Sequence, residues 1–405
     1  MSAPPAGRAR YDALGLRPVI NACATLTKLG GSVMPREVVD AMVRAARSYV
    51  DLEELQRRVG ARIAELTHNE AAYVSSGAAA GMVLATAACT VGMDQEAHAR
   101  IPRLDAVKNE VIVQHAHRNG YDYAVRQVGV TVVDVGGPEG TTREELESAF
   151  TDRTAAIFWF QGAMNVPGEL PLDQVIAIAG RRGVPVLVDA AAQLPPVENL
   201  WRFTQMGAAL AIFSGGKDLA GPQSSGLVLG RADLIEACRF HGNPNQSIGR
   251  PMKVGKEELM GALAAVERYV SIDHAARMRG FEATVARWVD RLAGIDGVAA
   301  RRDFPNEAGQ PVPWALVTFT DETTRDAIVD RLRSGEPSVA VAKAGSAAIH
   351  LNPMTLQPGE ADVVLDRLIE EIGNDSSRRG TPAAREADSP RHSGPDGLIS
   401  PQSQR

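Results

Sequence analysis

Hydrophobic residues in the middle of the chain form short continuous runs, and stretches with helical spacing separate these runs. The expected strands cover residues 70–74, 111–113, 131–135, 155–160, 184–188 and 208–213. The expected helices between them end near residue 89 and cover 121–128, 142–150, 172–182 and 200–206. Continuous apolar strands separated by helices favour a mostly parallel sheet with helices on both faces. The expected fold class is therefore α/β.

The pattern changes on both sides of this region. A strand at 17–21 and helices at 35–48 and 52–66 are expected before it, and the run 227–229 is expected to continue the sheet in an antiparallel sense. Long helices then lead to a shorter alternation of strands and helices, typical of a smaller α+β domain. The expected segments of this part are 257–272, 274–293, 312–320, 323–333, 346–351 and 360–372.

These patterns predict four regions. Residues 1–50 are expected to form an N-terminal arm and first helix, 51–250 a large domain and 251–373 a small C-terminal domain. Residues 374–405 contain only Leu398 and Ile399 as large apolar residues, so we expect a disordered tail there.

Composition narrows the class of protein. The 405 residues are 44% hydrophobic and 23% charged, as in ordinary globular proteins, and the net charge of −6 argues against phosphate neutralisation on a nucleic acid. The three cysteines show no disulfide or zinc spacing. The first residues have no apolar signal region, and the longest nearly apolar stretch, 81–93, is too short to span a bilayer. We expect a cytoplasmic protein.

A lysine follows the last expected strand of the large domain. The strand 208–213 runs into Ser214-Gly215-Gly216, and Lys217 comes next. An amine that is partly desolvated at such a position has a lowered pKa and can form a Schiff base with a carbonyl cofactor. The alternative is a surface lysine in a loop. A phosphate-binding loop is excluded, because Ala211 and Asp218 occupy positions where that motif needs glycine and serine or threonine.

Two further groups accompany this lysine. Asp189 ends the strand 184–188, and functional groups collect at the carboxyl ends of strands in an open parallel sheet. Ser76, Gly77 and Ala78 stand where a strand passes into a helix, and the free N–H groups of a helix start bind anions. Either feature alone is equally explained as a helix cap.

Together these residues resemble the pyridoxal-phosphate enzymes of fold type I, and in particular the group that contains selenocysteine synthase and D-glucosaminate-6-phosphate ammonia-lyase. The resemblance covers roughly residues 17–368. It is carried by the motifs RPVINACATLTKLGGS, SSGAAAGM, KNEVIVQHAHRNGYDYA, VLVDAAAQLPP and FSGGKDLAGPQSSGLVLGR. It implies pyridoxal 5′-phosphate as cofactor, a three-layer αβα large domain and a homodimer or higher homo-oligomer.

The resemblance also implies roles for single residues. Lys217 forms the Schiff base with the cofactor and moves the substrate's α-proton, and Asp189 pairs with the pyridinium nitrogen. Ser76, Gly77, Ala78 and Ser214 are expected to hold the cofactor phosphate, Ala191 to lie under the ring and Gln193 to reach its phenolic oxygen. His117 is preferred over His115 for the upper ring face. A metal site on the two histidines, or a structural histidine, is the alternative.

Substrate contacts are expected from two polar loops and a small-domain cation. The candidates are Asn21, Thr25, Thr27, Lys28, Arg118, Arg250 and Lys343. Fold type I enzymes commonly bind the substrate carboxylate with a small-domain arginine, but the matching region here offers only Lys343. A lysine cannot form the bidentate contact of an arginine, so Arg250 is the alternative partner for the carboxylate.

The resemblance favours a lyase that removes the α-proton of a small hydroxylated amino acid and eliminates the β-substituent. Aldolase, racemase or epimerase and aminotransferase reactions are alternatives on the same fold. A selenium transferase acting on charged tRNA is a further alternative. The acidic balance and the short N-terminal arm, without a basic extension, disfavour it. The expected partner is thus a small amino acid, with neither nucleic acid nor membrane.

Overall fold

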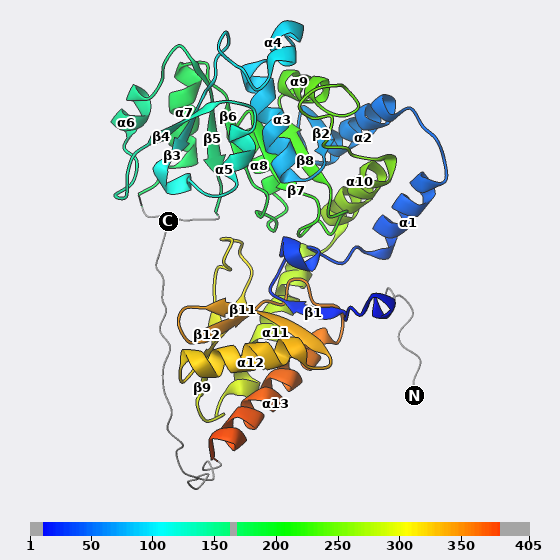
Figure 1. Ribbon diagram of the computed structural model, residues 1–405, viewed down its shortest axis with the longest axis vertical. Coiled ribbons are helices and arrows are strands. Elements are labelled where there is room, and N and C mark those ends of the chain that lie inside the picture. The colour runs from blue at the N-terminus through cyan, green and yellow to red at the C-terminus, as the bar shows by residue number, and fades with distance from the viewer. Residues whose placement is uncertain (1–10, 163–167, 381–405) are drawn as a thin grey trace, which may run out of the picture.

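The computed structural model describes residues 11–162 and 168–380. The chain forms a large and a small domain, one above the other in Figure 1. The expected arm 1–10 and most of the expected tail, 381–405, lie outside the described residues.

The large domain is built on a seven-stranded mixed sheet. Its strands in spatial order are β2 (Ala71–Ser75), β8 (Gly226–Gly230), β7 (Leu210–Ser214), β6 (Val186–Asp189), β5 (Thr154–Phe160), β3 (Glu110–Gln114) and β4 (Thr131–Val135). The five strands from β7 to β4 are parallel, and β8 is antiparallel to both of its neighbours. The predicted α/β class and the antiparallel continuation at 227–229 are confirmed.

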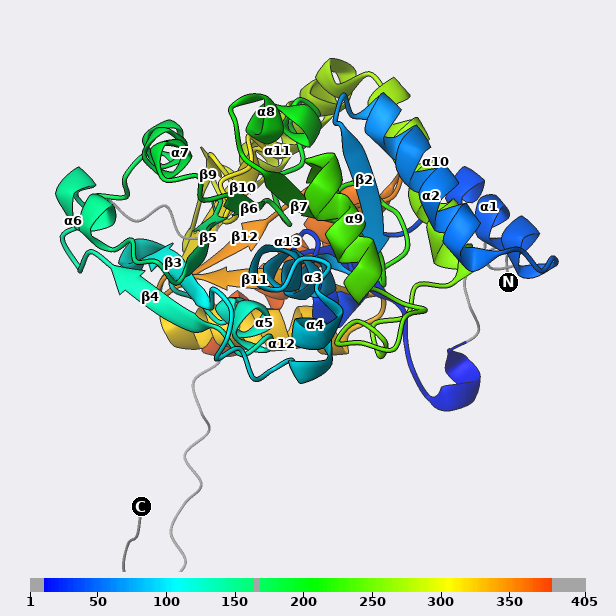
Figure 2. The same ribbon diagram turned by 90° about the horizontal axis from the view of Figure 1, so that it is seen from above.

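Helices cover both faces of this sheet, as Figure 2 shows for α7 and α8 on one side and α3 and α5 on the other. One hydrophobic cluster joins the sheet to α2 (Leu52–Leu66), α7 (Leu172–Arg181), α8 (Asn199–Gln205) and α10 (Lys256–Ser271). The other joins it to α3 (Ala78–Thr90), α4 (Gln95–Arg100), α5 (Asp122–Arg126) and α9 (Ala232–His241). The helix α6 (Arg143–Ser148) begins with a capping box of Thr142 and Glu145.

The small domain has a five-stranded sheet that includes the first strand of the chain. Its order is β1 (Val19–Ala22), β11 (Ser338–Ala344), β12 (Ala348–Leu351), β10 (Trp314–Phe319) and β9 (Val298–Asp303). The helices α11 (His274–Leu292), α12 (Glu322–Ser334) and α13 (Glu360–Gly380) bury their apolar faces with this sheet in a separate core. Because β1 pairs in parallel with β11, the N-terminal strand belongs to the small domain.

Three segments of the structure differ from the regions expected from the sequence. The helix α10 lies beyond the expected boundary at residue 250, yet Leu259 and Val266 are buried in the core of the large domain. The helix α1 (Arg36–Ala46) packs along α10, so it too lies on the large domain. In addition, α13 runs to Gly380 where a disordered tail was expected from residue 374, because Asp375 pairs with Arg331 at 3.2 Å.

The domains meet where β5, β6 and β7 end. A loop at 304–313 joins β9 to β10 and rises from the small domain toward the large one, drawn in yellow in Figure 1. Gln193 Nε2, four residues beyond the end of β6, donates a hydrogen bond of 2.8 Å to Ala308 O in this loop. The carboxyl ends of the parallel strands therefore face the small domain. Among the described residues, no helix has the length and apolar character needed to cross a membrane.

Candidate active site

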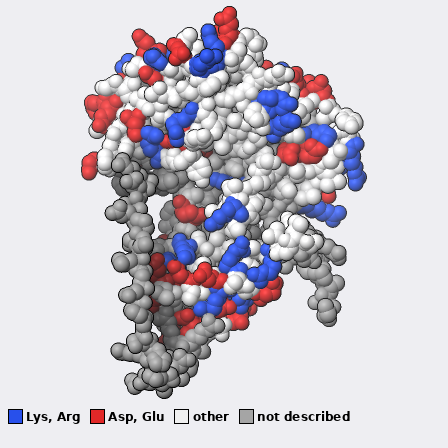
Figure 3. All heavy atoms as spheres, viewed as in Figure 1, with Lys and Arg blue, Asp and Glu red and all other residues white. Residues whose placement is uncertain are grey.

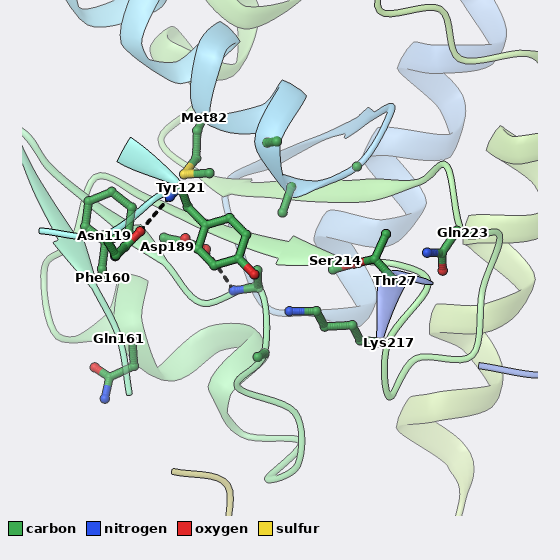
Figure 4. A pocket seen from close by; sticks show the side chains of 15 residues that line it. Thr27, Met82, Asn119, Tyr121, Phe160, Gln161, Asp189, Ser214, Lys217 and Gln223 are labelled. Atoms are coloured by element: carbon green, nitrogen blue, oxygen red, sulfur yellow. Dashed lines mark hydrogen bonds between the residues drawn. The ribbon is translucent and has the colours of Figure 1, made fainter. Parts of the chain in front are cut away.

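A cavity of about 250 Å³ lies at the carboxyl ends of β5, β6 and β7 (Figure 4). The start of α3, the segment before α5 and the loop after β1 also contribute to it. The lining residues are Thr27, Gly77, Ala78, Ala79, Met82, Asn119, Tyr121, Phe160, Gln161, Asp189, Ala191, Ala192, Ser214, Lys217 and Gln223. The structure thus brings Lys217, Asp189, Gly77, Ala78, Ala191, Ser214 and Thr27 together from the residues predicted for the site.

Lys217 extends from the turn after β7 across the cavity, and Figure 4 shows its amine pointing toward Asp189 and the ring of Tyr121. Its backbone is held because Ser32 Oγ donates a hydrogen bond of 2.5 Å to Lys217 O. Burial lowers the pKa of Lys217 below its ordinary value, while the carboxylates of Asp189 and Glu307 oppose that shift. A lowered pKa increases the neutral fraction of the amine, and the neutral amine is the nucleophilic form.

Asp189 ends β6 with a buried carboxyl group that faces the cavity. Its Oδ1 accepts a hydrogen bond of 3.0 Å from Ala191 N, which fixes the side chain. Burial raises the pKa of Asp189, and the bond from Ala191 and the charge of Lys217 work in the opposite direction. A buried carboxylate of this kind is stabilised by a cationic partner that enters the cavity.

The start of α3 forms an anion cradle of glycine and small residues. Gly77 has φ +100°, and no side chain caps the first N–H groups of the helix. A Cβ at Gly226 would lie 2.5 Å from Gly77 C and 2.8 Å from Ala78 N, so glycine is needed where β8 passes the cradle. Free N–H groups at a helix start bind a phosphate. Ser76 lies instead in an adjoining pocket, with Tyr123 and Met252.

A tyrosine ring rather than a histidine ring joins Phe160 in the cavity lining. Tyr121 is 63% exposed, and Figure 4 shows its ring among the lining side chains, near Asp189. Tyr121 N donates a hydrogen bond of 2.8 Å to Asn119 Oδ1, which fixes the turn that carries it. The sequence prediction overlooked this ring, although it lies four residues beyond His117 in the same motif.

Both predicted histidines lie outside the cavity lining. His117 is 2% exposed, and its Nε2 lies 2.7 Å from Glu169 Oε2 while its ring packs edge-on against Trp159. His115 is on the surface, with Nδ1 3.2 Å from Asp134 Oδ1. Since the two rings contact different carboxylates, the structure gives each a separate local partner.

Several polar residues predicted for the site instead form hydrogen bonds outside the cavity or do not line it. Gln193 bonds to Ala308 in the loop 304–313. Asn21 bonds to the backbone of Cys23 and Ala24, at 2.9 and 2.7 Å. Thr25 is half-buried outside the lining, and Lys28 is exposed beside it.

The predicted substrate cations do not line the cavity either. Arg118 forms ion pairs with Asp122 and Asp134 at 2.7 and 2.9 Å. Lys343 pairs with Asp326 at 2.6 Å, and Arg250 is exposed on a loop, 3.5 Å from Asn243. Among the lining residues, which all lie in the described part of the chain, Lys217 is the only cation.

Comparison with known proteins decides the family. The family model of L-seryl-tRNA selenium transferase matches residues 19–280. The chain belongs to this family. It is 36% identical to a 5′-C-glycyluridine monooxygenase-decarboxylase of a Streptomyces species, over 89% of this chain and 91% of that protein. It is 31% identical to the D-glucosaminate-6-phosphate ammonia lyase of Salmonella typhimurium, over 89% of this chain and 97% of that one.

Solved structures agree with this assignment. A structure of D-glucosaminate-6-phosphate ammonia-lyase superposes with a TM-score of 0.79 at 30% identity, covering 91% of this chain and 99% of that chain. Serine palmitoyltransferase from S. paucimobilis with a bound aldimine of pyridoxal phosphate and myriocin shares the fold, with a TM-score of 0.56 at 13% identity and 88% of each chain covered. The predicted resemblance, fold type I and the pyridoxal-phosphate cofactor are confirmed.

The residues of the cavity fit this cofactor. The uncapped start of α3 and Ser214 match its phosphate, the buried carboxyl of Asp189 matches its ring nitrogen, and Lys217 matches its aldehyde. The glycine at 226 keeps the phosphate cradle open. The protein is therefore an enzyme dependent on pyridoxal phosphate.

Proposed function

We propose that this enzyme is a lyase that removes the α-proton of a small hydroxylated amino acid and eliminates the β-hydroxyl group, releasing ammonia and a keto acid. The observation that carries the proposal is the partly desolvated Lys217 beside the buried Asp189, in a chain related to an ammonia lyase.

Lys217, Asp189, Tyr121 and the start of α3 each have a part in this reaction. When bound, pyridoxal phosphate supplies an electron sink that makes the α-proton of the substrate removable. Lys217 accepts that proton, because its neutral amine lies within the cavity and its pKa is lowered by burial. Asp189 would hold the protonated ring nitrogen of the cofactor, and the start of α3 would hold its phosphate. Tyr121, whose ring lines the cavity, would pack against the cofactor ring.

The proposal is tested by substrate screening. The purified enzyme, loaded with pyridoxal phosphate, is given hydroxylated amino acids with and without a phosphate group, and ammonia and keto acid are measured together. Stoichiometric release of both, lost in Lys217→Ala and kept in Lys108→Ala, supports the lyase; Lys108 is an exposed lysine just before β3, outside the cavity lining. Amino transfer to an added keto acid, or change of configuration without ammonia, would contradict it.

A second candidate is oxidative decarboxylation of an amino acid. It is favoured by the 36% identity to the glycyluridine monooxygenase-decarboxylase, and by a cavity lining without the arginine that usually clamps a substrate carboxylate. Oxygen uptake and carbon dioxide release in the same screen distinguish it from the lyase. The lyase reaction consumes no oxygen and releases no carbon dioxide.

We further propose a homodimer in the cytoplasm, acting on a free amino acid rather than on tRNA. Val39 and Val43 on α1, and Tyr49 and Val50 beyond it, expose apolar side chains together, which favours a covered surface. Figure 3 shows acidic and basic side chains interspersed on one face of the molecule, unlike the basic stripe of a nucleic-acid binder. Light scattering of the purified protein tests the dimer. A gel shift with tRNA tests whether the protein binds tRNA.

A further inference from the structure

A second cavity, of about 430 Å³, lies beside the candidate active site. It is lined by α8, by the segment that enters α7 and, from the small domain, by Gly309 and Pro311 of the loop 304–313. Trp159 and Phe203 line it from the face of the sheet that α7 and α8 cover (Figure 2). The active-site cavity reaches instead to the start of α3, so the two cavities lie toward different faces of the sheet.

The two cavities share Gln161, which directly follows β5. Its Oε1 accepts a hydrogen bond of 2.9 Å from Trp159 Nε1, and Figure 4 shows its amide turned away from Lys217. The small-domain loop is bound to the large domain at the same place, because Gln193, another lining residue, donates to Ala308 O at 2.8 Å. A ligand in the second cavity would therefore contact both domains and a residue of the active-site lining.

The second cavity is lined by opposite charges that do not neutralise each other. Arg202 on α8 and Glu169 before α7 both line it, yet no ion pair joins them. Glu169 Oε2 lies 2.7 Å from His117 Nε2, which leaves Oε1 as a free acceptor. Within the part of the chain that the structure describes, the exposed guanidinium of Arg202 has neither a hydrogen bond nor an ion pair. Both charges are therefore available to a ligand.

A buried amide adds an unsatisfied acceptor to this lining. Asn199, the first residue of α8, is 6% exposed and lines the cavity. Its Nδ2 donates a hydrogen bond of 2.7 Å to Gln193 O, which fixes the orientation of the amide, but its Oδ1 is buried without a partner. A buried acceptor without a hydrogen bond is destabilising, and a donor supplied by a ligand would remove that cost.

The remaining walls of the cavity are apolar. Trp159, Leu172, Phe203 and Met206 contribute them. The lining thus combines a free cation, a carboxylate, an unsatisfied carbonyl oxygen and an aromatic and aliphatic wall. A few polar groups placed in an apolar pocket are typical of a site for a small molecule. The molecule that complements this set has a carboxylate, a separate ammonium group and an apolar side chain.

We propose that this second cavity binds a free α-amino acid with an apolar side chain. The carboxylate of the ligand pairs with the guanidinium of Arg202, and its ammonium group donates to Glu169 Oε1 and Asn199 Oδ1. Its side chain packs against Trp159 and Phe203. The ligand takes no part in the reaction at Lys217, but it bridges the two domains that form the active site. The inference goes beyond the proposed function and does not depend on it.

The test measures binding without turnover. The loaded enzyme is first reduced with borohydride, so that the fixed cofactor can no longer react with an added amine. Calorimetry then compares L-valine with isovalerate, which lacks the ammonium group, and with isobutylamine, which lacks the carboxylate. Valine is expected to bind at least about 10-fold more tightly than either fragment, because each fragment loses one charge-assisted contact.

Two variants separate the contacts. Arg202→Gln should weaken valine and isovalerate by at least about 10-fold and leave isobutylamine unchanged. Glu169→Gln should weaken valine and isobutylamine and leave isovalerate unchanged. Arg100→Gln, at an exposed arginine that ends α4 and lines neither cavity, serves as control and should bind all three like the wild type. Valine should also raise the thermal midpoint of the wild type but not that of Arg202→Gln.

Three results would overturn the site. The wild type would give no binding heat with valine, it would bind valine no more tightly than the fragments, or Arg202→Gln would bind valine as the wild type does. The fragments are compared in the wild type, so a variant that fails to fold does not affect the first two results. None of the three bears on the proposed lyase, whose failure is seen in the separate screen for ammonia and keto acid.

Discussion

Arg277 donates two hydrogen bonds to Asp218, the residue that directly follows Lys217. The distances are 2.8 Å from Nη1 to Oδ2 and 2.5 Å from Nη2 to Oδ1, and Tyr269 Oη donates to Oδ2 at 2.6 Å. Asp218 is buried, and Arg277 stands on α11 at the start of the small domain. This bidentate contact ties the lysine-bearing turn to the helix that enters the small domain.

Arg277→Ala is expected to destabilise the protein and to loosen Lys217, because Asp218 would keep a buried charge with Tyr269 as its remaining partner. The expected cost is about 2 kcal/mol, less than for a fully buried ion pair, because Arg277 is partly exposed. Thermal unfolding measures the loss, and visible absorbance measures cofactor retention. Arg279→Ala, at an exposed position on the same helix, serves as control and should change neither.

Tyr121 is expected to contribute to cofactor affinity through its ring. Tyr121→Ala should weaken binding of pyridoxal phosphate by roughly 5-fold, in line with about 1 kcal/mol for an aromatic contact, while Tyr121→Phe should bind normally. Titration of cofactor-free protein, followed by absorbance, measures this. Tyr123→Ala removes an exposed ring from α5 outside the cavity and should have no effect. If His117→Gln weakened binding more than Tyr121→Ala, the assignment of the ring contact to Tyr121 would be refuted.

His241 is expected to make the stability of the fold depend on pH. Burial lowers its pKa to about 4 from an ordinary value of 6.5; the charge of His98 adds to this, and a hydrogen bond of 2.8 Å between Nε2 and Gly92 O opposes it. Between these two values the unfolded chain binds a proton that the folded chain does not. Stability from this group is therefore present above pH 6.5 and lost as the pH falls toward 4.

The expected loss from His241 between pH 7 and pH 5 is about 2 kcal/mol. His241→Gln should remove that part of the pH dependence, whereas His68→Gln, at an exposed histidine, should retain it. Thermal midpoints of the three proteins at both pH values provide the measurement. A slope in His241→Gln equal to that of the wild type would show that other groups cause the loss.

Much of the fold could be predicted because the hydrophobic pattern that marks each helix or strand lies within a short stretch of sequence. The continuous apolar strands of the parallel sheet and the amphipathic face of α2 are visible in the sequence and appear in the structure as expected. The strand β9 was overlooked because it is an edge strand with exposed Arg301 and Arg302, which breaks the apolar run. The place of β1 in the small sheet depends on pairing with β11, more than 300 residues away, and no local pattern encodes it.

The candidate site also contains both residues that the local sequence predicts and residues that it does not. Lys217, Asp189 and the start of α3 lie at strand ends and a helix start, so their convergence follows from the order of elements. Tyr121 could not be assigned in this way, because it reaches the cavity through a turn held by Asn119. Gln193 has another partner because it bonds to Ala308 of the small domain, and Lys343 because it pairs with Asp326 within the small domain; neither pairing is encoded by a local sequence pattern.

The central claim is that Lys217 carries the cofactor. The most direct measurement is borohydride reduction of the loaded protein, followed by peptide mass spectrometry and absorbance, with Lys217→Ala and Lys108→Ala in parallel. We expect the visible band to disappear on reduction, with the mass of reduced pyridoxal phosphate fixed on the Lys217 peptide of the wild type and of Lys108→Ala. Lys217→Ala should show no such modification and at least about 1,000-fold lower activity. A colourless protein, or a cofactor fixed on another lysine, would contradict the account.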